Sequence, residues 1–277
     1  MRKTTLEPFG RSAVFLAGLV LLCTGCAQFR PLADLPAERS SDPETGNFWK
    51  ASYSEESGLN YIITFPAEYD STASGGSGSG GSENEPAYPL IIFLHSLEER
   101  GEEIEKLINN PEGEGKGLAA YALAAEKFPF LTVSPLCPKG TGWPMITARL
   151  SRLLEEVSTS YPVDSSRIYL TGVSMGGMGT WSWGMAAPEQ FAAIAPISGG
   201  IYTPPMERNP EALTAVPVWA FHDRYDPSIP LKKEEGFVEE VLEAGGSVRY
   251  TVTEQGRHYI HTSVYAAGDL FDWFLEQ

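Results

Sequence analysis

The chain has 277 residues, of which 42% are hydrophobic, and its 20 basic and 36 acidic residues give a formal net charge of −16 at pH 7. This hydrophobic content is enough to bury a core and excludes wholesale disorder. The acidic excess excludes a general binder of nucleic-acid backbones, because such proteins neutralise phosphates with lysine and arginine. Three cysteines are too few for a disulfide framework.

The first 25 residues predict a secretory signal. Arg2 and Lys3 precede an apolar run over 13–22, which is too short to span a bilayer and is typical of the centre of a signal peptide. The run ends in Leu-Cys-Thr-Gly-Cys, with small residues directly before Cys26. This ending resembles the lipobox of bacterial lipoproteins. The resemblance implies acylation of Cys26, export across the inner membrane, and a lipid anchor in the periplasm or at the outer membrane. The alternative is an ordinary signal peptide that is cut nearby, with simple secretion.

The sequence predicts one folded domain after a tether. Residues 26–45 are rich in proline and charge and are interpreted as the tether, and residues 46–277 as the domain. The stretch 71–82 consists of glycine, serine, threonine and alanine, a composition typical of a flexible segment. Only about 20 residues of fold-like sequence come before it, too few for a separate core. We therefore interpret it as a surface loop between two strands of the same domain.

Strand and helix patterns alternate along the domain. Short apolar runs predict strands at 61–65, 90–94, 131–134, 167–171, 191–197, 216–221 and 248–252. Apolar residues at helical spacing predict helices around 150–161 and over 175–187, 231–244 and 264–275. This alternation predicts an α/β fold with a mostly parallel sheet and helices on both faces.

One short motif carries chemistry. Gly172-Val-Ser-Met-Gly176 fits the pattern G-x-S-x-G, and it lies between a predicted strand and a predicted helix. In that context the serine occupies a sharp turn, and glycines two residues before and after it avoid a collision. The helix that follows directs free N–H groups towards a developing oxyanion. Ser174 is therefore the predicted nucleophile.

A serine nucleophile needs a histidine base and a carboxylate that orients it. Of the four histidines, His258 and His261 follow the last predicted strand, so either could be the base. Asp223 and Asp226 both follow the strand before that one, so either could be the acid. His95 and His222 lie at strand ends and are expected to be structural. No second pair of ligands appears at metal spacing, so no metal site is predicted.

The domain resembles the α/β-hydrolase superfamily from about Tyr61 to the C-terminus. Within it, the chain is similar to the bacterial carboxylesterase, phospholipase-like and feruloyl-esterase-like group, which is related to polyhydroxyalkanoate depolymerases and prolyl-oligopeptidase-type domains. The matching motifs are Leu-His and Glu-Arg-Gly within 94–101, Val-Asp-x-x-Arg-Ile-Tyr at 163–169, Gly-x-Ser-Met-Gly-Gly-x-Gly-Thr-Trp at 172–181, Pro-Glu-x-Phe-Ala-Ala at 188–193 and Pro-Val-Trp-Ala-Phe-His at 217–222. The resemblance implies the α/β-hydrolase fold and a triad of Ser174, His258 and Asp226.

The resemblance also implies an oxyanion hole, and here the sequence departs from the group. Its donors would be the backbone N–H of Met175 and that of Ser96 or Leu97. Ser96 and Glu98 stand where the group usually has glycine, so their side chains could crowd the hole. Trp143 follows another strand at the same edge of the sheet and is a candidate substrate contact as well as a candidate core residue.

We therefore expect a serine esterase that acts through an acyl-enzyme on acylated polysaccharide or small esters. It would need no cofactor, would bind no nucleic acid, and would meet the membrane only through its lipid. A prolyl-oligopeptidase-type peptidase and a catalytically silent surface lipoprotein that binds glycan or a partner protein are the alternatives. The acyl group, the alcohol and the oligomeric state do not follow from the sequence.

Overall fold

The computed structural model describes residues 40–41, 46–69, 86–109, 117–202 and 206–277. All of them belong to one compact unit, Pro31–Gln277. The predicted signal, Cys26 and the Gly/Ser stretch at 71–82 lie outside the described residues. In the part of the chain that the structure describes, no helix has the length and apolar character needed to cross a membrane.

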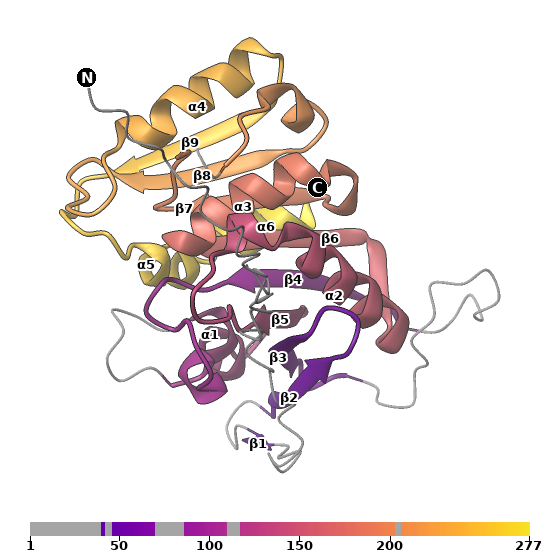
Figure 1. Cartoon of the computed structure of the whole chain (residues 1–277). Helices are drawn as coiled ribbons and strands as arrows, with labels where there is room; N and C mark the ends of the chain where they lie inside the picture. Colours follow the sequence, from indigo (N-terminus) through magenta and orange to yellow (C-terminus); the bar gives the residue numbers. More distant parts are fainter. Residues whose placement is uncertain (1–39, 42–45, 70–85, 110–116, 203–205) are drawn as a thin grey trace, which may run out of the picture. The chain divides into compact units, whose positions relative to one another are not determined.

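The strands of the described residues form one sheet in the order β1-β2-β3-β5-β4-β6-β7-β8-β9 (Figure 1). Their bounds are β1 Ser40–Ser41, β2 Phe48–Ser54, β3 Leu59–Phe65, β4 Tyr88–Leu94, β5 Leu131–Pro135, β6 Val163–Val173, β7 Ala193–Ile197, β8 Val218–Asp223 and β9 Val248–Thr253. Strands β1 to β3 pair antiparallel with one another, and β3 also pairs antiparallel with β5. All the pairings from β5 through β4 to β9 are parallel, which confirms the predicted mostly parallel sheet.

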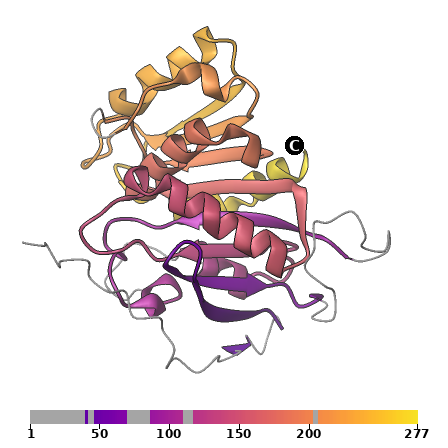
Figure 2. The same ribbon diagram turned by 45° about the vertical axis from the view of Figure 1, so that its right-hand side comes forward.

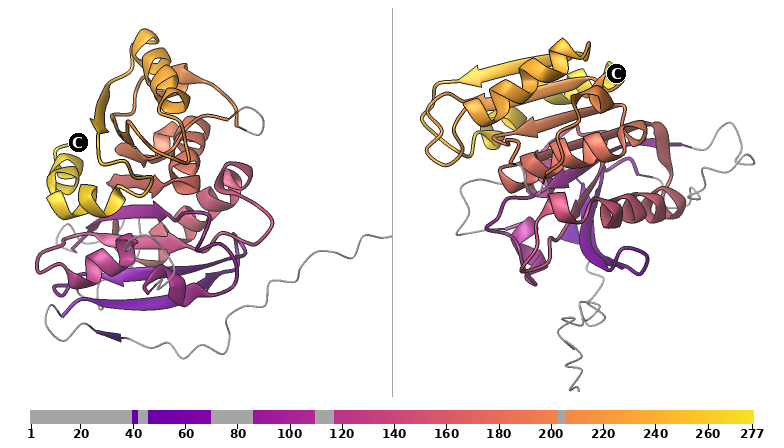
Figure 3. Two further views of the ribbon diagram at one scale, coloured as in Figure 1. Left: turned by 90° about the vertical axis from the view of Figure 1, so that its left-hand side faces the viewer. Right: turned by 45° about the horizontal axis from the view of Figure 1, so that its top comes forward.

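Helices cover both faces of the sheet, as the alternating pattern predicts. They are α1 Leu118–Ala124, α2 Thr147–Ser160, α3 Met175–Ala186, α4 Lys232–Glu243, α5 His261–Ala267 and α6 Asp269–Leu275. One hydrophobic core joins α2, α3 and α4 to one face, and a second joins α1, α5 and α6 to the other. Figure 3 (left) shows α4 and α5–α6 on opposite sides of the sheet, and Figure 2 shows α2 lying across it.

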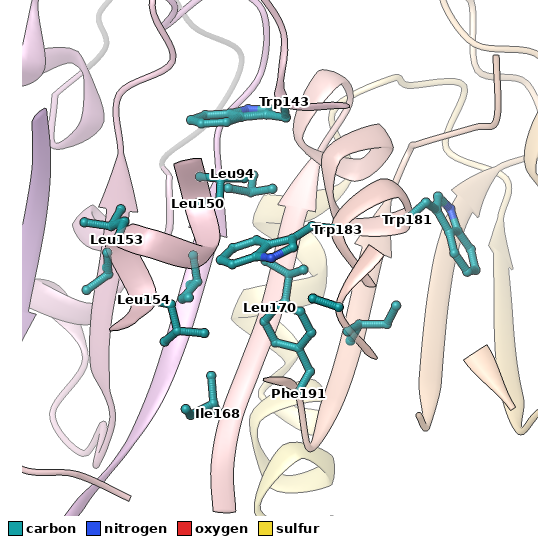
Figure 4. Close-up of a cluster of buried hydrophobic side chains, with 14 of the residues drawn as sticks. Leu94, Trp143, Leu150, Leu153, Leu154, Ile168, Leu170, Trp181, Trp183 and Phe191 are labelled. Carbon is teal, nitrogen blue, oxygen red and sulfur yellow. The ribbon is translucent and has the colours of Figure 1, made fainter. Parts of the chain in front are cut away.

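Helix α3 is the most deeply buried helix of the fold, with ten of its twelve residues buried. Its two tryptophans point to different sides. Trp183 lies among apolar residues that include Leu170 and Phe191, and its Nε1 donates to Ser151 Oγ at 2.9 Å (Figure 4). Trp181 points away from that cluster and meets Phe237 of α4 edge to face at 5.1 Å. A helix enclosed on all sides needs small residues where it approaches its neighbours closely, which explains its glycines.

Four details differ from the prediction. The predicted helix over 264–275 is two helices, because Gly268 between them has a left-handed backbone with φ of 82°. Strand β2 and helix α1 were not predicted. Most residues of β2 are half-buried, so its sequence contains no continuous apolar run that would indicate a strand. Ser40–Ser41, inside the predicted tether at 26–45, forms β1 against β2.

The register of the parallel strands brings their carboxyl ends to one edge of the sheet. Leu94 at the end of β4 pairs with Gly172 near the end of β6, and Val173 pairs with Ile197 at the end of β7. Ile197 in turn pairs with Phe221 of β8. The loops that follow these strands therefore converge, and they carry the predicted site residues.

Candidate active site

Ser174 lies at the tip of a sharp turn between β6 and α3. Its backbone has φ of 59° and ψ of −117°, a left-handed conformation that L-residues rarely adopt. The glycines beside it are required by contact: a Cβ on Gly172 would lie 2.7 Å from Leu94 O, and one on Gly176 only 1.7 Å from the same oxygen. The strained turn is thus held against the end of β4.

The same turn is also held against β7. A Cβ on Gly177 would lie 2.6 Å from Ile197 O, and the N–H of Ser174 donates to that oxygen at 3.0 Å. Among the residues that the structure describes, the N–H of Met175 has no hydrogen-bond acceptor, as expected for the first turn of a helix. The start of α3 therefore offers a free donor directly beside the serine.

A chain of hydrogen bonds connects Ser174 to His258 and Asp226. His258 Nε2 lies 2.7 Å from Ser174 Oγ, and His258 Nδ1 lies 2.6 Å from Asp226 Oδ2. Ser174 and His258 are buried, with 8% and 7% of their surface exposed, and the side chain of Asp226 is completely buried. This is the arrangement of nucleophile, base and orienting acid that serine hydrolases use.

Two backbone groups fix Asp226 in place. The N–H groups of Ser228 and Ile229 donate to its Oδ1 at 2.7 and 2.9 Å, which leaves Oδ2 for His258. Burial alone would raise the pKa of Asp226, but the hydrogen bonds from His258 and from these two N–H groups outweigh burial and leave the pKa below its ordinary value. Asp226 therefore faces His258 as a carboxylate.

The other aspartate, Asp223, does not reach either histidine that the sequence offered as a base. Its carboxylate accepts hydrogen bonds from the N–H groups of Tyr225, Gln255 and Gly256 and from the Thr253 hydroxyl, at 2.6 to 3.0 Å. It joins the loop after β8 to the loop after β9, and so brings Asp226 towards His258. His261 begins α5 and is likewise outside the hydrogen-bonded chain.

Comparison with known proteins adds to this geometry. A family model described as phospholipase/carboxylesterase matches residues 138–267. The bifunctional acetylxylan esterase/xylanase of Neocallimastix patriciarum is 31% identical over 160 residues, which cover 55% of this chain and 21% of that protein. The crystal structure of a thermostable esterase is 26% identical with a TM-score of 0.67 and matches 84% of this chain and 63% of its own. The chain has the α/β-hydrolase fold and is similar to hydrolases of the phospholipase/carboxylesterase type.

A ferulic acid esterase structure supports the fold of this α/β-hydrolase. It has a TM-score of 0.58 at 16% identity and covers 82% of this chain and 96% of its own. The chain spans less than two thirds of the length of both the acetylxylan esterase/xylanase and the thermostable esterase. The fold expected from the sequence and the resemblance to carboxylesterases are confirmed.

The second expected group of oxyanion donors lies in the loop after β4. In the described part of this α/β-hydrolase, the N–H groups of Ser96 and Leu97 have no hydrogen-bond acceptor. The loop lies against the start of α3, since a Cβ on Gly176 would be 2.9 Å from His95 O. The Ser96 hydroxyl donates to Glu99 Oε2 at 2.6 Å, within the same loop, and Leu97 is 53% exposed.

His95 supports this loop from inside. The N–H of Cys137 donates to His95 Nε2 at 2.9 Å, so the ring proton is on Nδ1, which donates to Ser96 O at 2.6 Å. Burial lowers the pKa of His95 to about 4, even though the nearby Glu99 opposes the effect. The ring is neutral and structural.

Trp143 is completely buried, and this argues against the substrate contact considered from the sequence. Its Nε1 donates to His95 O at 2.9 Å, and its ring meets the His95 ring edge to face at 4.9 Å. A Cβ on Gly179 of α3 would lie 2.4 Å from Trp143 Cβ, so the side chain is packed against that helix. In this structure Trp143 is a core residue behind the loop that follows β4.

Ser198 and Glu234 contribute to the site but were not identified from the sequence. Ser198 follows β7 with φ of 48°, and its hydroxyl donates to the carbonyl oxygen of His258 at 2.6 Å. Glu234 of α4 is fully buried and contacts His222. Neither lies in a recognisable motif, although a glutamate within the apolar spacing of α4 is a signal that could have been noticed.

Proposed function

We propose that this chain is a serine esterase in which Ser174, His258 and Asp226 form a catalytic triad. The observation that carries the proposal is the continuous hydrogen-bonded chain from Ser174 Oγ through His258 to Asp226, with links of 2.7 and 2.6 Å. The similarity to proteins named as esterases supports the type of bond that is cleaved.

Each residue has a defined task in the reaction. Ser174 Oγ attacks the ester carbonyl carbon while His258 Nε2 takes its proton, and Asp226 stabilises the imidazolium that forms. The N–H of Met175 and that of Ser96 or Leu97 donate to the oxyanion. The tetrahedral intermediate then breaks its bond to the alcohol oxygen, which receives the proton from His258. Water repeats the sequence on the acyl-enzyme and releases the acid.

The substrate that we propose is a short acyl ester on a polysaccharide or a small molecule. The support comes from the relative named acetylxylan esterase/xylanase, which is 31% identical over 160 residues. Initial rates on acetyl, long-chain acyl and feruloyl esters would test this choice. A strong preference for acetyl esters supports it, and a preference for long acyl chains contradicts it.

The reaction itself is tested with 4-nitrophenyl acetate on the purified chain. We expect Ser174→Ala to abolish hydrolysis, whereas the matched control Ser165→Ala should retain it, because Ser165 is exposed at the other end of β6. Equal rates for Ser174→Ala and the parent chain would refute the triad. A fluorophosphonate that labels Ser174 without ester turnover would favour the peptidase, and no labelling would favour the silent lipoprotein.

We further propose that the chain acts outside the cytoplasm, anchored through Cys26. This rests on the basic start, the short apolar run and the small residues before Cys26. In a bacterial host the chain should then partition into detergent with the membranes, and Cys26→Ser should release it. Partition that is unchanged by the substitution would contradict the lipid anchor.

A further inference from the structure

A second histidine lies behind the proposed triad acid. His222, near the end of β8, is fully buried, and its Nε2 lies 2.9 Å from Ile229 O and 3.5 Å from Asp226 Oδ2. Its Nδ1 lies 2.7 Å from Oε2 of the buried Glu234, whose Oε1 accepts the Trp181 indole N–H at 2.8 Å. The proposed reaction gives His222 no task.

The partners of His222 determine where its protons are. A backbone carbonyl only accepts, so Nε2 must carry a proton and donate to Ile229 O. A carboxylate also accepts, so Nδ1 donates to Glu234. Burial alone would lower the pKa of His222, but Glu234, Ile229 O and Asp226 outweigh burial and raise it. With Glu234 as a carboxylate, both ring nitrogens donate, and the ring is an imidazolium in an ion pair with Glu234.

Asp226 Oδ2 consequently lies between two histidines. His258 Nδ1 is 2.6 Å from this oxygen and His222 Nε2 is 3.5 Å from it, so the two nitrogens are no more than about 6.1 Å apart. At this separation inside a protein, two positive charges repel each other appreciably. The charge on His222 therefore opposes protonation of His258 and partly offsets the attraction of Asp226.

Several other groups surround the pair. Tyr250 of β9 faces Glu234, whose charge adds to burial in raising the pKa of Tyr250. Burial and the charge of Asp226 raise the pKa of Tyr202, in the loop after β7. The Lys233 ammonium of α4 lies 5.0 Å from the centroid of the Tyr202 ring. Both tyrosines are neutral near pH 7, since the ordinary pKa of tyrosine is 10.0 and burial raises it further. The charged side chains that these contacts place around His222 and Asp226 are Glu234, Glu235 and Lys233 of α4 and Arg224 after β8.

We propose that His222 is a positively charged positioning residue. It holds the Asp226 carboxylate from behind, and its charge keeps His258 unprotonated down to a lower pH. The proposal rests on the proposed function, because it assigns His222 a role in tuning that same base. Glu234 supplies the negative charge that keeps His222 protonated, and Trp181 anchors Glu234.

The pH dependence of kcat/KM tests this role, since attack requires an unprotonated His258. In His222→Gln the positive charge is gone, so Asp226 holds a proton on His258 more strongly. We expect the acid limb of the profile to move up by about 0.5–1 pH unit. We expect the plateau value of kcat/KM to fall through kcat rather than through KM. Glu234→Gln removes the partner that keeps His222 charged and should shift the limb in the same direction.

Trp181→Phe is the matched control. It removes a hydrogen bond to Glu234 but leaves both charges, so it should lower stability and leave the acid limb in place. A limb that moves equally in Trp181→Phe, or that does not move in either charge variant, would overturn the proposal.

A second measurement does not depend on activity. In Ser174→Ala labelled with ¹⁵N at histidine, the His222 ring should keep both N–H protons at pH 7.5, and Glu234→Gln should remove one of them. Loss of the Nδ1 proton from His222 with Glu234 intact would contradict the inference even if the chain hydrolyses esters. A parent chain without esterase activity but with a doubly protonated His222 would refute the proposed function and leave the charge assignment standing.

Discussion

Two aspartates three positions apart perform different tasks at the end of β8. Asp226 uses one carboxylate oxygen for His258 and the other for two backbone N–H groups. Asp223 uses both oxygens to join two loops. Spacing alone could not separate them, because both follow the same strand; the family motif pointed to Asp226, and the hydrogen bonds agree with it.

This division of tasks predicts different effects for two isosteric substitutions: one should lower activity and the other should lower stability. Asp226→Asn should lower kcat on 4-nitrophenyl acetate by about 10³–10⁴-fold, because the amide no longer stabilises the imidazolium. Asp223→Asn should instead lower the free energy of unfolding by about 2–4 kcal/mol, because one carboxylate oxygen that accepts hydrogen bonds becomes an NH₂ group. Urea unfolding and initial rates on both variants measure the two effects. If Asp223→Asn lost more kcat than Asp226→Asn while remaining folded, Asp223 would be the acid.

At the level of elements, the site depends on how closely α3 approaches β4 and β7. Gly172 and Gly176 contact Leu94 O, and Gly177 contacts Ile197 O. The G-x-S-x-G pattern predicted this turn because its glycines are required by short-range contacts. The break between α5 and α6 could not be predicted as easily, because apolar spacing continues across Gly268 and only the positive φ there separates the helices.

Two glycine substitutions test the close approach. Gly176→Ala should lower the free energy of unfolding by about 1–3 kcal/mol and reduce activity, because its Cβ would overlap Leu94 O and displace the loop that follows β4. Gly236→Ala in α4 is the control, since a Cβ there meets nothing within 4 Å. It should gain about 0.5–1 kcal/mol from helix propensity. Full stability and activity in Gly176→Ala would show that the turn can relax.

For the molecule as a whole, net charge predicts which partners to expect, but it does not predict how the fold responds to acid. That response depends on buried groups, and His95 and His222 show why composition does not reveal it. Both were expected to be structural strand-end histidines. Burial lowers the pKa of His95, whereas at His222 burial is outweighed by Glu234, Ile229 O and Asp226 together, so its pKa is raised. The sequence placed both rings at the correct edge of the sheet but could not identify their partners.

The buried neutral His95 predicts a loss of stability in mild acid. Its pKa is about 4 in the folded chain against an ordinary value of 6.5. The unfolded state therefore binds a proton first as the pH falls. The stability contributed by the neutral ring is complete above pH 6.5 and declines from there towards pH 4. His222, whose pKa is raised, already makes its full contribution below 6.5 and adds no slope in this window.

Urea unfolding at pH 7 and pH 4.5 measures this contribution by comparing the parent chain with His95→Gln. The glutamine can still accept the Cys137 N–H but does not titrate. We expect the parent to lose roughly 2–3 kcal/mol more than the variant between the two pH values, although the variant should be less stable at pH 7 because of altered packing against Trp143. Equal losses in the two proteins would show that His95 does not cause the sensitivity to acid, and that the aspartates with lowered pKa values, or the repulsion of a changed net charge, must account for it.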